Sequence, residues 1–393
     1  MTRDCAAPGA ATTAAQARNG TDWSDAIMGK HTVRCAFLLL ILATLRQAQG
    51  SQAAPAAATG AVPVRTQTEI EDLIRKTGAT PPDWWDATPL NFPKTLDLTL
   101  TPPPKGSGWD PQKNVGQYFW SVINENSSKW KEGVKLAHHL MILNEKDAKK
   151  VADMQGQMAH LYEYCLCDYA RAAYWRIKKG EVDTEDLAVC YWKLGSKAMA
   201  KDVLSRCGND DTRHGTIIKL WADLGEFDRA LKEAETKAQN DKADIAYLMA
   251  GEACRTIGRF ADALGYYQKV LACDAAKAGR DFKQSKARAQ ASIDAIKVFD
   301  TLDLKRVPDG VYANSSVGYT GPVSIELTVK NARIEEVKVT KHAEKQYYAS
   351  LTETPRQIVL KQGVKGVDTY SSATITSEAI INACAKALAS GMK

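Results

Sequence analysis

Apolar side chains recur at helical spacing along most of the chain, and at strand spacing in one short stretch near the C-terminus. The helical pattern runs over about 114–299, so this region is expected to consist of packed helices. Val323–Val329 and Ile334–Val339 alternate apolar and polar residues, as half-buried strands do, and Asn331-Ala332 lies between them. The pattern therefore predicts a β-hairpin.

Two helices are expected to follow the hairpin. The first spans about 344–361 with an interruption near Pro355, and the second spans 378–388. Helices packed on an antiparallel sheet make a small α+β domain, which we place at 304–393. The predicted fold class is multidomain, with an α-helical region followed by this α+β domain.

A repeat runs through the helical region. Three segments echo one another around Gly195, Gly225 and Gly258, so these glycines stand 30 and 33 residues apart. The spacing is similar to that of the tetratricopeptide repeat, whose period is about 34 residues. Asp168–Ala173 is a more degenerate copy. Stacked copies would form a solenoid that holds a partner on its concave surface, or that only spaces the C-terminal domain from something else, and both interpretations stay open.

The N-terminal part has the pattern of a targeting segment followed by a linker. Residues 1–27 are rich in Ala, Thr and Gly, and we interpret them as an over-called start ahead of the true start at Met28. A basic stretch then precedes the apolar run Cys35–Leu45, which at about ten residues is too short to span a bilayer. Residues 28–50 are therefore predicted to be a signal peptide, which implies a periplasmic or secreted protein. Residues 51–113, rich in Ala and Pro, are predicted to be a linker and an extended strap.

Composition and charge narrow the class of protein. Of 393 residues, 45% are hydrophobic and 25% are charged, as in ordinary soluble proteins with more than one domain. The net charge is +6, and no run of basic residues alternates with aromatic ones, so nucleic-acid binding has little support.

We place the helical repeat domain at 114–303.

Metal and disulfide chemistry have few candidates. Seven cysteines follow the predicted signal peptide, and an odd number leaves at least one thiol unpaired. There is no CxxCH motif for haem and no pair of CxxC motifs for zinc or an iron–sulfur cluster. His138 and His139 are interpreted as a half-buried helix face and not as a metal site. One disulfide is left open among four residues: Cys165, Cys167, Cys190 and Cys207.

The stretch Asp368–Ser377 is small, rich in Ser and Thr, and runs into the last predicted helix. Ser and Thr at a helix start commonly cap its first N–H groups. The same N–H groups and the helix dipole also favour an anion such as phosphate. From these residues alone, a simple N-cap and a phosphate site both stay open.

This stretch resembles the attachment motif of the FMN-binding domain family, as found in the C subunit of the sodium-translocating NADH:quinone reductase and the G subunit of the Rnf complex. The family motif reads Asp, two variable residues, Ser or Thr, Gly, Ala, Thr, any residue, Thr. Five positions match it: Asp368, Ser371, Ala373, Thr374 and Thr376.

Upstream blocks add to the resemblance in the same order as in the family. Residues 309–312 resemble its DGxY opening. A GYxG segment and a histidine–glutamate pair follow, and the resemblance implies that they line the flavin ring: Gly318, Tyr319, Gly321, His342 and Glu344.

The resemblance implies FMN as the cofactor, esterified through its phosphate to Thr374 by a flavin transferase. Ser371, Ser372 and the amides of Ala373 and Thr374 would bind phosphate oxygens. Asp368 would orient the attachment segment or help the transferase to recognise it.

Two features of the C-terminal domain bear on how flavin would be held. Ser372 stands where the family has glycine, which supplies positive φ or close backbone approach, so either the turn is right-handed or attachment is weakened. The domain contains no Trp or Phe, so the flavin ring would be partly exposed or lie against tyrosines: Tyr319, Tyr347, Tyr348 or Tyr370.

Three functions follow from these observations. The first is an exported flavoprotein that transfers electrons with a redox partner protein, in the membrane or beside it, docked on the helical repeats. It would act as a redox subunit more than as an independent catalyst. The second is an extracytoplasmic interaction scaffold with a degenerate flavin domain. The third, a flavin-dependent reductase, would need convergent polar groups beside the flavin, and the sequence offers no convincing set.

Overall fold

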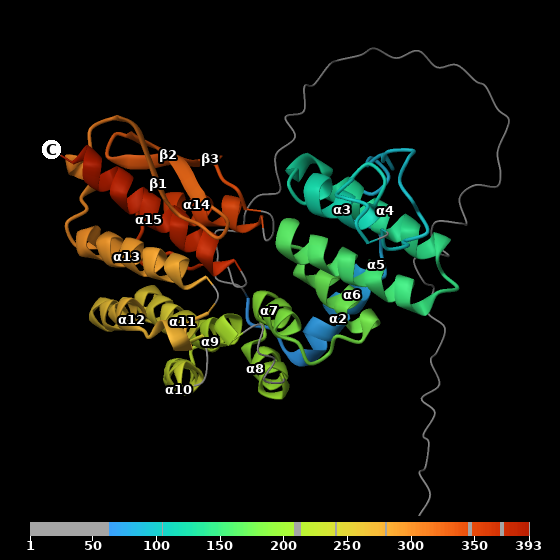
Figure 1. Ribbon diagram of the computed structural model, residues 1–393, viewed down its shortest axis with the longest axis horizontal. Coiled ribbons are helices and arrows are strands. Elements are labelled where there is room, and N and C mark those ends of the chain that lie inside the picture. Colours follow the sequence, from blue (N-terminus) through green and yellow to red (C-terminus); the bar gives the residue numbers. More distant parts are fainter. Residues whose placement is uncertain are drawn as a thin grey trace, which may run out of the picture. The chain divides into compact units, whose positions relative to one another are not determined.

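The chain divides into two compact units, residues 1–58 with 79–81 and residues 59–78 with 82–393, and every element below belongs to the second. The predicted over-called start, the signal peptide and the first part of the linker fall within 1–62, outside the described residues. A computed structural model (Figure 1) describes these ranges: 63–103, 105–207, 214–239, 242–279, 281–344, 348–369 and 373–392.

The part before the sheet is helical. Neighbouring helices pack on one another in chain order, as α7 on α8, α9 on α10 and α11 on α12. Tetratricopeptide identity and a solenoid are not established by this arrangement and stay predictions. The α-helices are α2 (Gln67–Gly78), α3 (Val115–Tyr118), α4 (Trp130–Leu143), α5 (Ala148–His160), α6 (Tyr169–Lys179), α7 (Glu185–Lys193), α8 (Lys197–Arg206), α9 (His214–Asp223), α10 (Phe227–Ala238), α11 (Ala243–Thr256), α12 (Phe260–Ala272) and α13 (Phe282–Phe299).

The glycines of the sequence repeat occupy equivalent turns. Gly195, Gly225 and Gly258 have φ of 106°, 90° and 80°, and each lies between the two helices of a pair. Each glycine N–H donates to the carbonyl three residues back, and the next N–H donates to the carbonyl five residues before it. Glycine adopts this left-handed conformation without strain, so three helix pairs can turn in the same way.

The sheet has three antiparallel strands in the order β1-β2-β3: β1 (Gly310–Val317), β2 (Pro322–Lys330) and β3 (Arg333–Lys341). The predicted hairpin is present as β2 and β3. Asn331 and Ala332 have φ of 51° and 55°, the two positive values that a tight hairpin turn requires. Strand β1 was not expected from the pattern of apolar residues.

Both helices of the C-terminal part differ from expectation. The helix α14 (Ser350–Lys361) begins six residues later than predicted, and it continues through Pro355 without interruption. Pro355 is the sixth residue of the helix, so its missing N–H leaves the Leu351 carbonyl without its usual helical donor, but the helix does not end there. The helix α15 (Thr374–Gly391) begins four residues before the predicted start, so Thr374 belongs to the helix and not to the turn.

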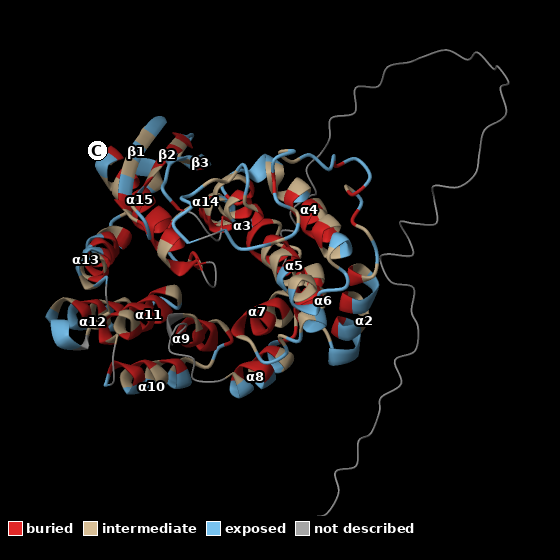
Figure 2. Cartoon of the chain, turned by 45° about the vertical axis from the view of Figure 1, so that its right-hand side comes forward, coloured by how far each residue is buried: buried red, intermediate tan, exposed pale blue. Residues whose placement is uncertain are grey.

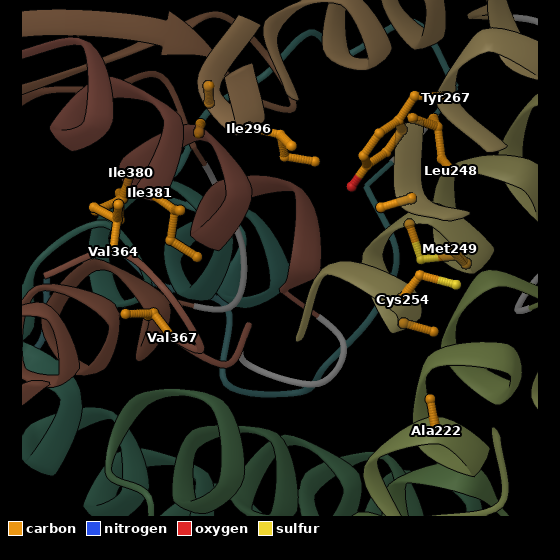
Figure 3. Close-up of a cluster of buried hydrophobic side chains, with 14 of the residues drawn as sticks. Ala222, Leu248, Met249, Cys254, Tyr267, Ile296, Val364, Val367, Ile380 and Ile381 are labelled. Atoms are coloured by element: carbon orange, nitrogen blue, oxygen red, sulfur yellow. The ribbon is translucent and has the colours of Figure 1, made fainter. Parts of the chain in front are cut away.

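One apolar core joins these layers. Helix α15 packs on β1 and β2 with one face and on α13 with another, and α14 packs on β3 (Figure 1). Buried positions follow α15 along most of its length (Figure 2). The same apolar cluster contains residues from α9, α11, α12, α13, the segment before α15 and α15 itself. Examples are Ala222, Met249, Tyr267, Ile296, Val367 and Ile380 (Figure 3).

The strap after α2 lies on α4 by specific contacts. Trp85 is 6% exposed, and its ring centroid lies 5.2 Å from that of His138. Lys135 donates its Nζ to the carbonyls of Trp85 and Thr88, at 2.9 and 2.6 Å. The predicted half-buried histidine face is thus a packing surface at His138, which is 3% exposed.

No disulfide joins cysteines of the described ranges, including Cys165, Cys167, Cys190 and Cys207. Burial raises the pKa of Cys165, and likewise that of Cys190 and Cys384, as expected for small core residues. Over the described ranges, no helix has the length and apolar character needed to cross a membrane.

Candidate functional site

The last helix begins without a side-chain cap. Its N-cap residue is Ala373, which offers no side-chain acceptor, and Thr374 is the first helical residue. The N–H of Ser377 donates to the Ala373 carbonyl at 3.1 Å and begins the helical pattern. The N–H groups of the three preceding residues have no carbonyl within the helix to bond, and the helix dipole adds positive potential there. The start of α15 is therefore suited to an anion, and the simple Ser/Thr N-cap is not what the structure has.

Glu344 ties this helix start to a turn of the sheet. Its Oε2 accepts a hydrogen bond from the Thr376 hydroxyl at 2.7 Å. Its Oε1 accepts from the backbone N–H of Tyr319 at 2.9 Å. The Glu344 side chain is 4% exposed, so both bonds are shielded from water. Three residues predicted from the sequence are thus brought together.

The turn that holds Tyr319 needs glycine at its first position. Gly318 donates its N–H to the Gly321 carbonyl at 3.0 Å. A Cβ on Gly318 would lie 2.6 Å from Glu344 Oε1 and 2.6 Å from the Gly321 oxygen, closer than side chains approach. From α13, Gln284 donates its Nε2 to the Gly318 carbonyl at 2.6 Å and also to the Tyr319 carbonyl. The helical region therefore contributes to fixing this turn.

Aromatic rings gather beside Glu344. The Tyr348 hydroxyl donates to the Glu344 backbone carbonyl at 2.8 Å, and Tyr348 is 3% exposed. The rings of His342 and Trp130 lie 6.0 and 6.3 Å from the Tyr348 ring. Trp130 belongs to α4, so the helical region supplies a large aromatic side chain that the C-terminal domain lacks. Tyr319 is 57% exposed and lies on the surface.

Asp368 is bound by a lysine from α9. The Lys219 ammonium donates to Asp368 Oδ1 at 2.8 Å and also contacts Asp223, and the side chains of Lys219 and Asp223 are 1% and 2% exposed. Burial opposes ionisation of Asp368, but Lys219 and Lys193 outweigh it, so the pKa of Asp368 lies below its ordinary value. For Asp223, burial and the charge of Asp368 prevail over Lys219 and raise the pKa to about 7. Two carboxylates thus share one ammonium.

Arg255 of α11 holds the residue before Asp368. Its Nη2 donates to the Val367 carbonyl at 3.0 Å, and its Nε and Nη2 both donate to Glu252 at 2.6 Å. A second buried pair joins α13 to α15, where Arg288 Nη2 donates to Glu378 Oε2 at 2.8 Å. Burial raises the pKa of Glu378 to about 7, although Arg288 opposes the shift.

Two buried polar atoms near this segment have no hydrogen-bond partner among the described residues. They are the Thr369 hydroxyl, on a side chain that is fully buried, and Arg255 Nη1, on a side chain that is 1% exposed. The charge of Arg255 lowers the pKa of both Asp368 and Glu378. A guanidinium N–H and a hydroxyl that are left over in this way can bind an anion with free oxygens.

A second part of the helical region packs on Ala373, the residue before Thr374. Ala373 is 5% exposed and belongs to a small cluster with Tyr164 and Ala349, against which Cys167 and Tyr169 pack. Ala349 donates its N–H to the Tyr164 carbonyl at 2.8 Å. Residues from the π-helical turn Leu161–Cys165 and the start of α6 therefore cover the residue before Thr374.

The structure brings together most of the predicted site, and it adds residues that the sequence analysis missed. The residues in direct contact are Thr376, Glu344, Tyr319 and the two glycines of the turn. One short stretch of the chain contains Asp368, Ala373 and Thr374. The His342 ring lies beside the ring of Tyr348, whose hydroxyl donates to Glu344. The residues missed are Lys219, Arg255 and Trp130. Four expected contributors lie outside the described residues: Ser371, Ser372, Tyr347 and Tyr370.

Comparison with known proteins agrees with the C-terminal resemblance. Residues 318–389 match the model of the FMN-binding domain family. A curated protein from Treponema pallidum (strain Nichols), described as an uncharacterized protein, is 41% identical over 81 residues, which are 20% of this chain and 22% of that protein. The chain thus spans about a fifth of the length of that relative. No solved structure matches. Residues 318–389 are therefore similar to an FMN-binding domain.

Proposed function

We propose that this chain is an exported flavoprotein that carries FMN as a phosphoester on Thr374 and acts in extracytoplasmic electron transfer. The observation that carries the proposal is the start of α15. Thr374 is its first residue, and the N-cap residue Ala373 has no side-chain acceptor for the helix N–H groups. A phosphate esterified at this hydroxyl would lie where those groups and the helix dipole favour negative charge.

The residues around the helix start define what the protein contributes. The N–H groups of the first turn would bind phosphate oxygens, and Glu344 would hold Thr376 and the Tyr319 turn in place through its two hydrogen bonds. The rings of Trp130 and Tyr348 lie 6.3 Å apart, and the Tyr348 hydroxyl donates to the Glu344 carbonyl, so aromatic side chains lie beside this part of the site. When bound, FMN supplies the capacity to accept and release electrons, and the protein places it and excludes water.

The remaining parts of the proposal rest on the sequence. Export is supported by the basic and apolar pattern of residues 28–50, and a partner on the helical region is supported by the repeat around Gly195, Gly225 and Gly258. The alternative, an extracytoplasmic scaffold with a degenerate flavin domain, is favoured by Ser372 in place of the family glycine. The two proposals differ in one measurable property, which is bound flavin.

The test is the intact mass of the full chain, coexpressed with a flavin transferase and denatured before measurement. We expect a mass higher by one FMN less one water, since the ester forms with loss of water overall, and the added mass should map to the peptide that contains Thr374. Thr374→Val should abolish the added mass. Thr352→Val, which removes a hydroxyl from an exposed position of α14, should keep it.

Two results would count against the proposal. An unmodified, colourless wild-type protein would favour the scaffold, and flavin retained on denatured Thr374→Val protein would place the ester elsewhere. Sequencing the N-terminus of the secreted or periplasmic product tests export separately, with Ser51 as the expected first residue of the mature chain.

A further inference from the structure

We propose that Lys219 and Arg255, from helices α9 and α11, are positioning residues of the flavin site. They hold the segment Val367–Asp368, so that the helical region and the FMN-binding domain build the attachment site together. The inference rests on the proposed function, since it concerns how FMN on Thr374 would be held. Neither residue lies in the stretch matched by the family, which begins at residue 318.

The Lys219 contact reaches the motif aspartate directly. Its ammonium donates to Asp368 Oδ1 at 2.8 Å, although the two residues are 149 positions apart in the chain. The side chain of Lys219 is 1% exposed, whereas that of Asp368 is 27% exposed. A lysine so deeply buried is rare without a partner that compensates its charge. The contact therefore fixes Asp368 in one position relative to α9.

The Arg255 contact fixes the residue before Asp368. Two hydrogen bonds to Glu252 lock the guanidinium plane, and the same plane then donates to the Val367 carbonyl at 3.0 Å. On the other side of the segment, Gln357 of α14 accepts from the Asp368 N–H at 3.1 Å. Three side chains from three helices thus hold two consecutive residues, which is far more than a surface turn requires.

The placement of these contacts relative to Thr374 gives them a role beyond stability. The anchored segment ends at Asp368, five residues before Ala373, which is itself packed against Tyr164. The helical region therefore holds both the motif aspartate and the residue before Thr374. In addition, Arg255 Nη1 and the Thr369 hydroxyl have no partner among the described residues, so polar capacity is left over at this end of the stretch. A flavin on Thr374 would be held in a fixed position by these contacts.

The test uses the full chain, coexpressed with a flavin transferase, and compares Lys219→Gln with two controls. Asp223→Asn removes the other carboxylate that contacts Lys219 but keeps the bond to Asp368. Lys237→Gln removes a lysine of similar burial, 7% exposed and paired with Glu233, from α10, a helix that holds no residue of the site. Ester content from intact mass normalises the other readouts.

The readouts report on how the flavin is held. A flavin ring is planar and owes its visible circular dichroism to a fixed asymmetric setting, and iodide quenches its fluorescence according to its exposure. In Lys219→Gln, we expect the visible signal per flavin to fall by about half or more, and the iodide quenching constant to rise roughly twofold, because the anchored segment is released. Both controls should match wild type.

Each outcome decides the inference. If Lys219→Gln protein carries flavin with wild-type circular dichroism and quenching, Lys219 is a structural residue and the inference is wrong. If this variant does not fold, Lys219→Gln with Asp223→Asn, which removes one charge of each sign, takes its place and should show the same losses. If wild type carries no ester, the proposed function fails, a result distinct from a modified wild type that Lys219→Gln does not alter.

Discussion

Removing the carboxylate of Glu344 should loosen the start of α15 more than any single exposed charge does. This side chain is 4% exposed and accepts from the Tyr319 N–H at 2.9 Å and the Thr376 hydroxyl at 2.7 Å. Each hydrogen bond to a buried charged group contributes about 1.5–3 kcal/mol. Glu344→Ala therefore costs about 3–6 kcal/mol, since it leaves both donors buried without an acceptor. Glu344→Gln keeps one carbonyl acceptor and should cost about half as much.

Hydrogen exchange measured by mass spectrometry gives the free energy of opening for this part of the chain alone. We expect peptides from α15 and from the 318–321 turn to exchange at least about 100-fold faster in Glu344→Ala, since about 1.4 kcal/mol corresponds to a factor of ten. Glu336→Ala, an exposed carboxylate removed from β3, should stay within about 0.5 kcal/mol of wild type. Wild-type exchange in Glu344→Ala, or equal exchange in Glu344→Ala and Glu344→Gln, would refute the two-bond account.

Two further changes test the packing and the buried charges of the helical region. Gly251→Ala should cost about 1–3 kcal/mol of unfolding free energy, because its Cβ would lie 2.7 Å from the Tyr267 ring, whereas Gly265→Ala meets nothing within 4 Å and should be neutral or stabilising; urea unfolding followed by circular dichroism compares them. The raised pKa of Asp223, about 7, means that its contribution to stability is complete below its ordinary value of about 4 and is lost as pH rises through 7. The urea midpoint should therefore fall between pH 5 and pH 8, and fall less in Asp223→Asn; an unchanged pH dependence in that variant would show that Asp223 does not titrate there.

Local signals in the sequence were enough to predict the hairpin but not the first strand. The turn at Asn331-Ala332 separates two clean alternations, so β2 and β3 follow from short-range information. In β1 the sequence Gly-Val-Tyr-Ala-Asn-Ser-Ser-Val lacks alternation, and most of its residues are exposed or half-buried. It is a strand because β2 pairs with it and α15 packs on it. The amino-acid sequence of a strand does not by itself reveal such long-range partners.

The start of α15 was misplaced for a related reason. Thr374, Ile375, Thr376 and Ser377 are β-branched or hydroxyl residues with modest helix propensity, so the stretch reads as a loop. In the structure, α15 lies between the sheet and α13 and is buried on most of its surface. Tertiary packing of this kind supplies more stability than propensity removes. The consequence for the site is large, since it makes Thr374 the first residue of a helix.

The motif residues of the site could be predicted, whereas its supports from the helical region could not. Asp368, Glu344 and Thr376 were found by resemblance to a family, which carries information only about residues that the family shares. Lys219 and Arg255 belong to the preceding helices. One weak signal was present: Lys219 lies inside the apolar run Ile217–Trp221, and a lone charge on an apolar stripe implies a buried partner. The identity of that partner, 149 residues away, required the fold.

The match to the FMN-binding domain family therefore describes less than the working site. It covers residues 318–389 and so omits β1, on which α15 packs, as well as α9 and α11, which hold Asp368 and Val367. A fragment limited to the matched residues would lack one edge of the sheet, the side chains of Lys219 and Arg255, and the aromatic side chain of Trp130. The flavin environment in this chain should accordingly differ from that of an isolated domain with the same motif. The helices that hold the attachment stretch belong to the region proposed to bind a partner. A partner docked there would therefore affect the position of the flavin directly, through the contacts that one or two residues of these helices make with the stretch.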